Sequence, residues 1–123
     1  KWSVLYPQAW LPRVLNQDQK NLRFTAATGE FVEIIVQDNL QKQSLRDWYA
    51  GQSSDLDTAN LKETVTKNNF QALWEKEGAN TVYLTQEGAG TIYLMNYNIG
   101  GRTELNFGAI FKMMAESLTR SGI

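Results

Sequence analysis

Apolar and polar residues alternate with a period of two in several stretches of the 123-residue chain. This alternation predicts β-strands, because successive side chains of a strand point to opposite faces of its sheet. The predicted strands of the first half are 2–7, 22–26 and 30–37. Pro7 ends the first of them, and Trp10 and Pro12 follow in a stretch without a clear period, which we interpret as an irregular corner. A Thr28-Gly29 turn joins the second and third strands into a hairpin.

The second half of the chain is a run of short strands separated by turn residues. The predicted strands are 61–66, 70–75, 81–85 and 91–97. Connections of hairpin length imply an antiparallel sheet. In 91–97 both alternating sets of side chains are largely apolar, which predicts a central strand covered on both faces.

Two stretches have the period of an amphipathic helix. Ser44 is a favoured N-cap residue, with Asp47 in the capping-box position, and the following turns place three large side chains on one face: Leu45, Trp48 and Tyr49. Near the end of the chain, Thr103 is the predicted cap of a second helix that ends near Ser121-Gly122. The apolar stripe of this helix consists of Phe107, Ile110, Phe111, Met114 and Leu118.

A chain of this length holds one domain around one hydrophobic core, so residues 1–123 are predicted to form a single domain. The order of elements is strands, helix, several strands with short turns, and a final helix. This order predicts an α+β fold with a central, mainly antiparallel sheet that is covered by the apolar faces of two helices.

Six short segments resemble, in order, motifs of one known family. They are Leu5-Tyr6-Pro7-Gln8-Ala9-Trp10, the strand 31–37, Ser44-Leu45-Arg46-Asp47-Trp48, Asn69-Phe70-Gln71-Ala72, the strand 91–97 and the helix 107–118. Together they resemble the PsbP-like domains, whose fold is shared with Ran-binding nuclear-import factors and with exported bacterial domains of unknown function. Asn69 stands where glycine is commoner in the family.

The resemblance implies an α/β/α sandwich that is often extracytoplasmic, is usually non-enzymatic and acts through protein contacts. The resemblance also implies that this chain is a protein-interaction or accessory domain with a protein partner. The photosynthetic members support photosystem II, and some of them use histidines in metal or partner contacts. This chain has no histidine, so that role is not carried over.

The composition excludes several function classes. Histidine and cysteine are both absent, which removes the commonest general base, thiol catalysis and the usual ligands of transition metals. We therefore expect neither an enzyme nor a bound cofactor. The net charge is −1, and the basic residues are dispersed, which argues against a nucleic-acid partner. No apolar run approaches the roughly 20 residues that span a bilayer, although a signal peptide or a membrane tether upstream of Lys1 fits an extracytoplasmic domain.

Three residues are candidates for a binding site. Trp10 lies outside any clear periodicity, so it is either a core residue, the interpretation we place first, or a half-exposed anchor in a binding groove. Glu75 and Glu77 share one side of a strand end and support the alternative function, a small-molecule-binding domain or a weak hydrolase that uses carboxylates. Asp55 and Asp57 lack the glycine and the closing glutamate of a calcium loop, so no metal site is predicted.

Overall fold

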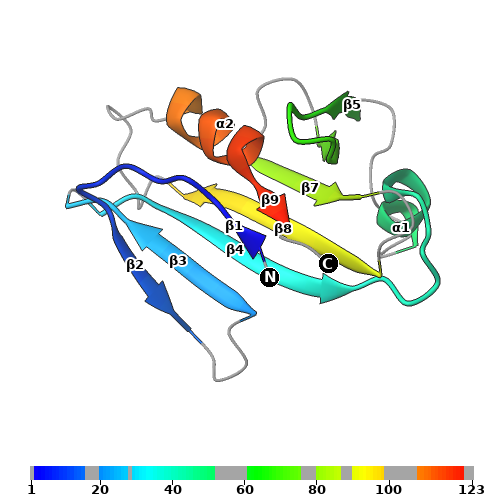
Figure 1. The fold of residues 1–123 in the computed structure, drawn as a ribbon, viewed down its shortest axis with the longest axis horizontal. Coiled ribbons are helices and arrows are strands. Elements are labelled where there is room, and N and C mark those ends of the chain that lie inside the picture. Colours follow the sequence, from blue (N-terminus) through cyan, green and yellow to red (C-terminus); the bar gives the residue numbers. More distant parts are fainter. Residues whose placement is uncertain are drawn as a thin grey trace.

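The computed structural model describes residues 2–15, 20–27, 29–51, 61–75, 80–86, 90–98 and 108–120. These residues form an α+β fold with a seven-stranded antiparallel sheet, a two-stranded sheet and two short helices (Figure 1). The strands of the main sheet, in spatial order, are β2 (Leu11–Val14), β3 (Asn21–Thr25), β4 (Phe31–Asp38), β8 (Thr91–Asn98), β7 (Thr81–Thr85), β6 (Gln71–Trp74) and β5 (Lys62–Val65).

Strand β8 lies at the centre of the main sheet, as its two apolar faces predict. It pairs with β4 along the full length of both strands, from Phe31 opposite Asn98 to Asp38 opposite Thr91. On its other side it pairs with β7. The antiparallel sheet and the approximate positions of the strands that begin at 22, 30, 61, 70, 81 and 91 are confirmed.

The main hydrophobic core lies between the sheet and helix α2 (Gly108–Ser117). Tyr93 and Met95 of β8 point into this core, together with Phe111 and Met114 of the helix. Phe111 and Met114 of the predicted helical stripe are buried, and Ile110 packs against the core while partly exposed. Leu118 is buried as expected, but it lies just beyond the end of the helix. Phe107 and the predicted cap Thr103 lie outside the described residues.

A second, smaller core lies under helix α1 (Leu45–Ala50). Leu45, Trp48 and Tyr49 pack there with Leu73 of β6 and Ile92 of β8. Ile92 and Tyr93 are neighbours in one strand, so their side chains point to opposite faces, and the two helices pack on opposite faces of the sheet. The Ser44 hydroxyl accepts a hydrogen bond from the Asp47 amide at 3.2 Å, which confirms the predicted N-cap of α1.

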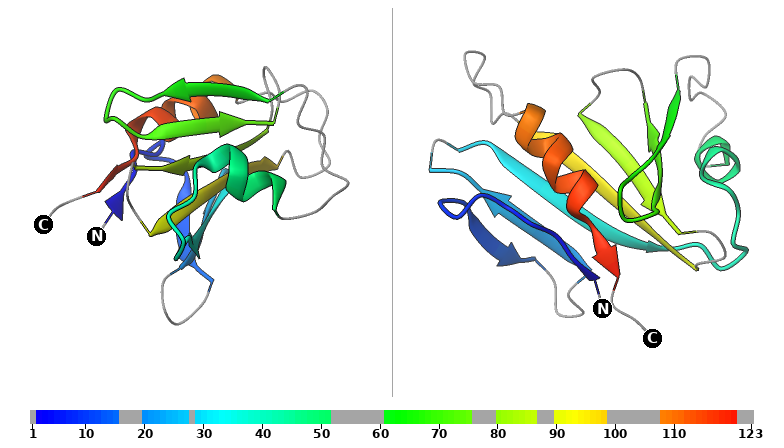
Figure 2. Two further views of the ribbon diagram at one scale, coloured as in Figure 1. Left: turned by 90° about the vertical axis from the view of Figure 1, so that its right-hand side faces the viewer. Right: turned by 45° about the horizontal axis from the view of Figure 1, so that its top comes forward.

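Both ends of the described chain depart from the sequence prediction. The first strand is only β1 (Trp2–Ser3), and it pairs with β9 (Thr119–Arg120), a strand that the sequence analysis assigned to the final helix. Helix α2 therefore ends at Ser117, and the first and last described residues lie side by side (Figure 2).

The predicted irregular corner around Pro12 is a strand instead. Strand β2 pairs with β3 and is the edge strand of the sheet as far as the structure describes it. Proline lacks the amide hydrogen of a ladder, but at a sheet edge the missing donor faces away from any partner strand. The prediction was wrong because proline breaks the alternation without excluding an edge strand.

Two turns depend on left-handed backbone geometry. Gly29 has φ +102° in the β3–β4 hairpin, which confirms the predicted turn at this glycine, whereas Thr28 lies outside the described residues. Asn69 has φ 66° in the β5–β6 turn, a conformation that asparagine tolerates better than most residues.

Candidate functional sites

Trp10 is a core residue in this structure. Its side chain is 5% exposed and packs in the main core, just before β2. Its backbone amide donates to the carbonyl oxygen of Pro7 at 2.9 Å, which closes a turn. This is the packing role that the sequence analysis placed first, and a side chain so deeply buried offers a partner very little surface.

Glu75 lies at the end of β6 and is half-buried on the α1 face of the sheet. The Tyr49 hydroxyl of α1 donates a hydrogen bond to its Oε2 atom at 3.2 Å. Tyr83 of β7 completes the group, with its ring centroid 5.3 Å from that of Tyr49. We refer to Tyr49, Glu75 and Tyr83 as the tyrosine–glutamate cluster.

The cluster holds a carboxylate between two phenols. Burial raises the pKa of Tyr83 to about 12, and the negative charge of Glu75, the neighbouring Tyr49 and a hydrogen bond to Glu75 add to this effect. Tyr83 therefore keeps its proton near neutral pH and acts as a hydrogen-bond donor rather than as a base. The second predicted carboxylate, Glu77, lies outside the described residues, so the structure does not show the two carboxylates together.

Sequence reasoning found Glu75 but missed the two tyrosines around it. A signal was present, because Tyr49 was expected on the buried face of its helix, and a buried phenol hydroxyl needs a hydrogen-bond partner. The helix and the two strands are distant in sequence, so the sequence alone could not show which acceptor Tyr49 would meet.

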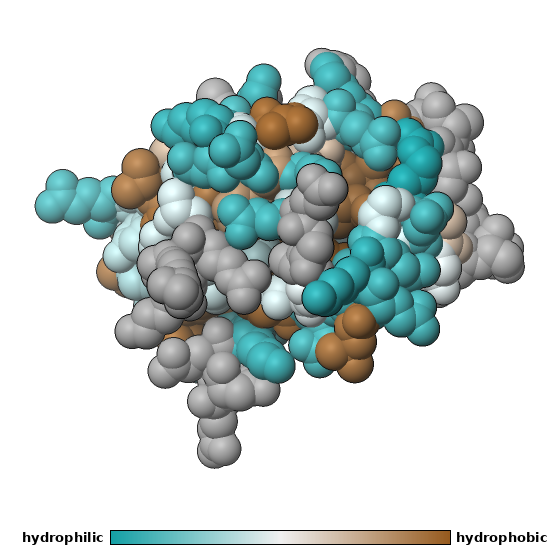
Figure 3. Space-filling model, turned by 45° about the vertical axis from the view of Figure 1, so that its right-hand side comes forward, coloured by the Kyte–Doolittle hydropathy of each residue, from teal (hydrophilic) through white to brown (hydrophobic). Residues whose placement is uncertain are grey.

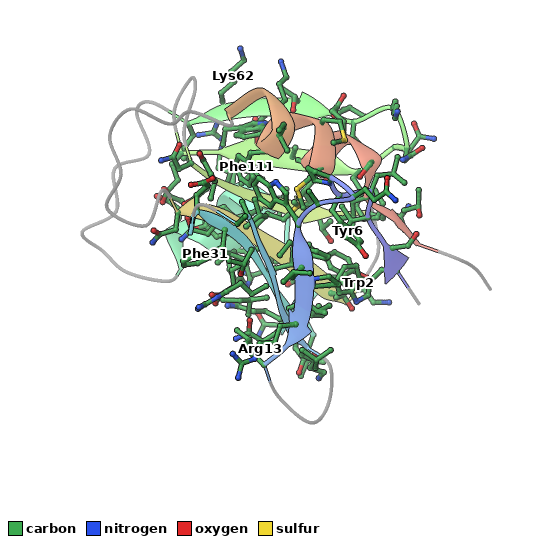
Figure 4. The ribbon with its side chains drawn as sticks, turned by 90° about the vertical axis from the view of Figure 1, so that its left-hand side faces the viewer. Trp2, Tyr6, Arg13, Phe31, Lys62 and Phe111 are labelled. Atoms are coloured by element: carbon green, nitrogen blue, oxygen red, sulfur yellow. The ribbon has the colours of Figure 1, made fainter. Side chains whose placement is uncertain are left out.

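A second candidate site is the face of β2, β3 and β4 that is turned away from α2. Eight side chains on this face belong to residues that are paired in the β2–β3 and β3–β4 registers: Leu11, Arg13, Asn21, Arg23, Thr25, Phe31, Glu33 and Ile35. We refer to it as the open face, because neither described helix packs on these residues; the residues buried by α1 lie on β6 and β8. Figure 4 shows Phe31 and Arg13 on the opposite side of the sheet from Trp2 and Tyr6.

A compact polar and aromatic group lies at the centre of the open face. The Arg23 Nη2 atom donates to Glu33 Oε1 at 2.9 Å across the β3–β4 ladder. The Arg23 guanidinium carbon lies 4.1 Å from the centroid of the Phe31 ring, within cation–π range. The Arg23 side chain is 38% exposed and that of Glu33 is 19% exposed, so this group is accessible from solvent.

Exposed apolar residues occur in several separate places on the described surface. Leu11 is 73% exposed at the rim of the open face, and Leu40, beyond the far end of β4, is 84% exposed. On the side of the molecule near α1, apolar patches are separated by hydrophilic residues (Figure 3). Single exposed apolar residues are normal in folded proteins, so they carry weight only where other features gather around them, as they do at Leu11.

Within the described ranges, no group of three or more carboxylate, histidine or cysteine side chains is placed to hold a metal ion. Asp55 and Asp57, which the sequence analysis rejected as a calcium loop, lie outside those ranges.

Neither helix that the structure describes is long and apolar enough to cross a membrane. No family model matches the sequence, and no curated protein or solved structure matches the chain.

Proposed function

We propose that this chain is a non-enzymatic protein-interaction domain that binds its partner through the open face. The observation that carries the proposal is the uneven cover of the sheet. Helix α2 buries one face, whereas on the other face the described helix α1 reaches only the β6–β8 part of the sheet. The remaining surface combines exposed and partly exposed apolar side chains with two arginines, a composition that is typical of protein interfaces.

The proposal includes a PsbP-like α/β/α sandwich in an extracytoplasmic compartment, with a membrane tether upstream of Lys1 in the full-length protein. Its support is the series of short family motifs along the sequence, together with two helices that pack on opposite faces of an antiparallel sheet. The full-length open reading frame tests the compartment directly. A signal peptide or a lipid-attachment cysteine upstream is expected, and purification of the native protein from the cytosol alone would contradict it.

The interaction surface is tested with two matched variants of the full-length protein. Leu11→Gln removes an exposed apolar side chain from the open face, and Leu40→Gln makes the same change elsewhere. Both positions are exposed, so neither variant should disturb folding. Each protein is used to capture binding partners from the envelope fraction of its native cells, and captured proteins are then purified and titrated against each variant.

The expected partner binds the parent and Leu40→Gln alike but binds Leu11→Gln about tenfold more weakly, which corresponds to the loss of one buried leucine side chain. Failure to find any protein that distinguishes the two variants would refute the open face as the binding surface. A folded-state check by denaturant melting accompanies each titration.

The alternative function is a small-molecule-binding domain or a weak carboxylate-based hydrolase at the tyrosine–glutamate cluster. The observation that favours it is the convergence of Tyr49 and Tyr83 on Glu75. Glu75→Gln keeps the shape of the side chain and removes its charge. A metabolite that raises the melting temperature of the parent but not of Glu75→Gln would support this alternative, and equal responses of the two proteins would remove its basis.

A further inference from the structure

Two arginines face each other across neighbouring strands of the open face. Arg13 of β2 is the register partner of Arg23 of β3. Like charges placed directly opposite in an antiparallel pair destabilise that pair. Glu33 is the single acidic residue among the eight that define the open face, so this surface carries a net positive charge in a chain whose overall charge is −1.

The two arginines differ in how they are held. Arg23 is fixed by Glu33 at 2.9 Å and by the Phe31 ring at 4.1 Å. Arg13 is exposed, and within the described part of the chain no carboxylate lies within ion-pair distance of it. One guanidinium is therefore positioned in advance, and the other is available to a new partner.

Strand β3, which carries Arg23, also carries two buried polar atoms without hydrogen-bond partners. Asn21 Oδ1 and Arg23 Nε are both shielded from solvent and unpaired. They lie two residues apart on β3, so they belong to the same face of the sheet. A buried unpaired donor or acceptor is unfavourable. A carboxylate of a ligand can accept a hydrogen bond from Arg23 Nε, whereas Asn21 Oδ1 is itself an acceptor and needs a donor such as a backbone N–H of the ligand.

We propose that the open face binds an acidic segment of a protein partner, with carboxylates of the segment paired to Arg13 and Arg23 and its apolar side chains packed on Leu11 and Phe31. This inference rests on the proposed function and names the class of partner. A guanidinium binds a carboxylate through two parallel N–H···O contacts, so a pair of adjacent arginines selects closely spaced acidic residues. The apolar neighbours distinguish such a segment from a purely polyanionic ligand.

The probe is a short acetylated peptide in which glutamate and leucine take turns at every second position, with serine between them, so that both kinds of side chain share one side of an extended segment. The matched peptide has glutamine in place of every glutamate. Each peptide is titrated into the isotope-labelled chain, and backbone amide shifts are followed by NMR. We expect saturable shifts on β2, β3 and β4 with the glutamate peptide, and weaker binding as the salt concentration rises. The glutamine peptide should bind at least about tenfold more weakly, because both guanidinium–carboxylate pairs are lost.

Arg13→Gln is the decisive variant, because the Arg13 side chain is exposed and its loss should leave the fold intact. It should weaken binding of the glutamate peptide about threefold or more, whereas Lys67→Gln, an exposed change in the β5–β6 turn, should not alter it. Equal binding of the two peptides, or shifts centred outside β2–β4, would overturn the inference. Shifts on β2 that depend on protein concentration without peptide would identify a second copy of the chain as the occupant instead.

The outcomes also separate this inference from the proposed function. If a native partner binds Arg13→Gln normally but no longer binds Leu11→Gln, the open face remains the interaction surface, and the inference that it binds an acidic segment is refuted. A native partner that is indifferent to both substitutions refutes the two proposals together.

Discussion

Replacement of Phe111 by alanine tests whether α2 forms the core that stabilises this fold. Phe111 is 2% exposed, and its ring lies edge-on to Trp74 at 5.9 Å and stacked on Tyr97 at 6.0 Å. Full burial of a large apolar side chain contributes about 2–3 kcal/mol, and each aromatic pair adds about 0.5–1.5 kcal/mol. Phe111→Ala should therefore lower the free energy of unfolding by about 3–5 kcal/mol, the range measured for such changes in protein cores.

Lys112→Ala is the matched control, because Lys112 is the next residue of the same helix and is exposed. Its free energy of unfolding should change by less than about 0.5 kcal/mol. Urea melts of the parent and both variants provide the comparison. With a slope of about 2 kcal/mol per molar urea, Phe111→Ala should move the midpoint down by about 2 M.

Coincident midpoints for Phe111→Ala and Lys112→Ala would refute the packing described here. Helix α2 would then be an exposed amphipathic element rather than the cover of the main core. An unfolded Phe111→Ala protein would agree with the argument, because its expected loss is a large share of the roughly 5–15 kcal/mol of a typical domain. In that event Phe111→Leu, which retains apolar volume, should fold and fall between the parent and alanine.

Three further predictions concern single side chains. Asn68→Ala should lower the free energy of unfolding by about 1 kcal/mol, because the side-chain amide of Asn68 donates to the carbonyl oxygens of Glu116 and Leu118 at the end of α2. An unchanged denaturant melt would contradict this role. Because the φ angle of Asn69 is 66°, Asn69→Gly should leave the free energy of unfolding unchanged or raise it slightly, and Asn69→Ala should lower it by about 1 kcal/mol. The reverse order of the two variants in the same assay would be inconsistent with that geometry. The raised pKa of Tyr83 predicts full stability below pH 10.0 and a loss of stability as the pH rises toward about 12, because the unfolded chain releases this proton first. Tyr83→Phe should reduce that loss in pH-dependent unfolding measurements, and identical profiles of parent and variant would exclude Tyr83 as its source.

The sequence predicted the parts of the fold that depend on local periodicity. The apolar alternation of 91–97 indicated the central strand, and β8 occupies that position. Cover on both faces is confirmed only in part. Ile92 is buried under α1 and Tyr93, Met95 and Tyr97 are buried on the α2 face, whereas Asn96 is exposed. Alternation reports which faces are apolar, but the reach of a covering helix depends on its length and position, which no single strand specifies.

The features that the sequence missed depend on contacts between distant residues. Strand β9 exists because Trp2–Ser3 lies beside Thr119–Arg120, and a hydrogen bond between Ser3 and Thr119 hydroxyls at 2.8 Å joins the two. A helical reading of that segment was reasonable, since local propensity is easily overridden by such pairing. The tyrosine–glutamate cluster has the same origin, because its members come from one helix and two strands.

The open face also depends on an alternation of side chains in β4 whose two sides can be assigned only in the folded sheet. In β4 the side chains of Val32 and Ile34 are buried under α2, whereas Phe31 and Glu33 alternate with them toward the open face. An uncovered phenylalanine would expose apolar surface, and the Arg23 guanidinium lies over its ring. The arginine therefore serves the free protein as a polar cover for an aromatic side chain. The Glu33 salt bridge and the Phe31 ring hold the guanidinium in this position, so in the proposed complex a carboxylate of the partner would pair with Arg23 where it already lies, and apolar side chains of the partner would pack beside the covered ring.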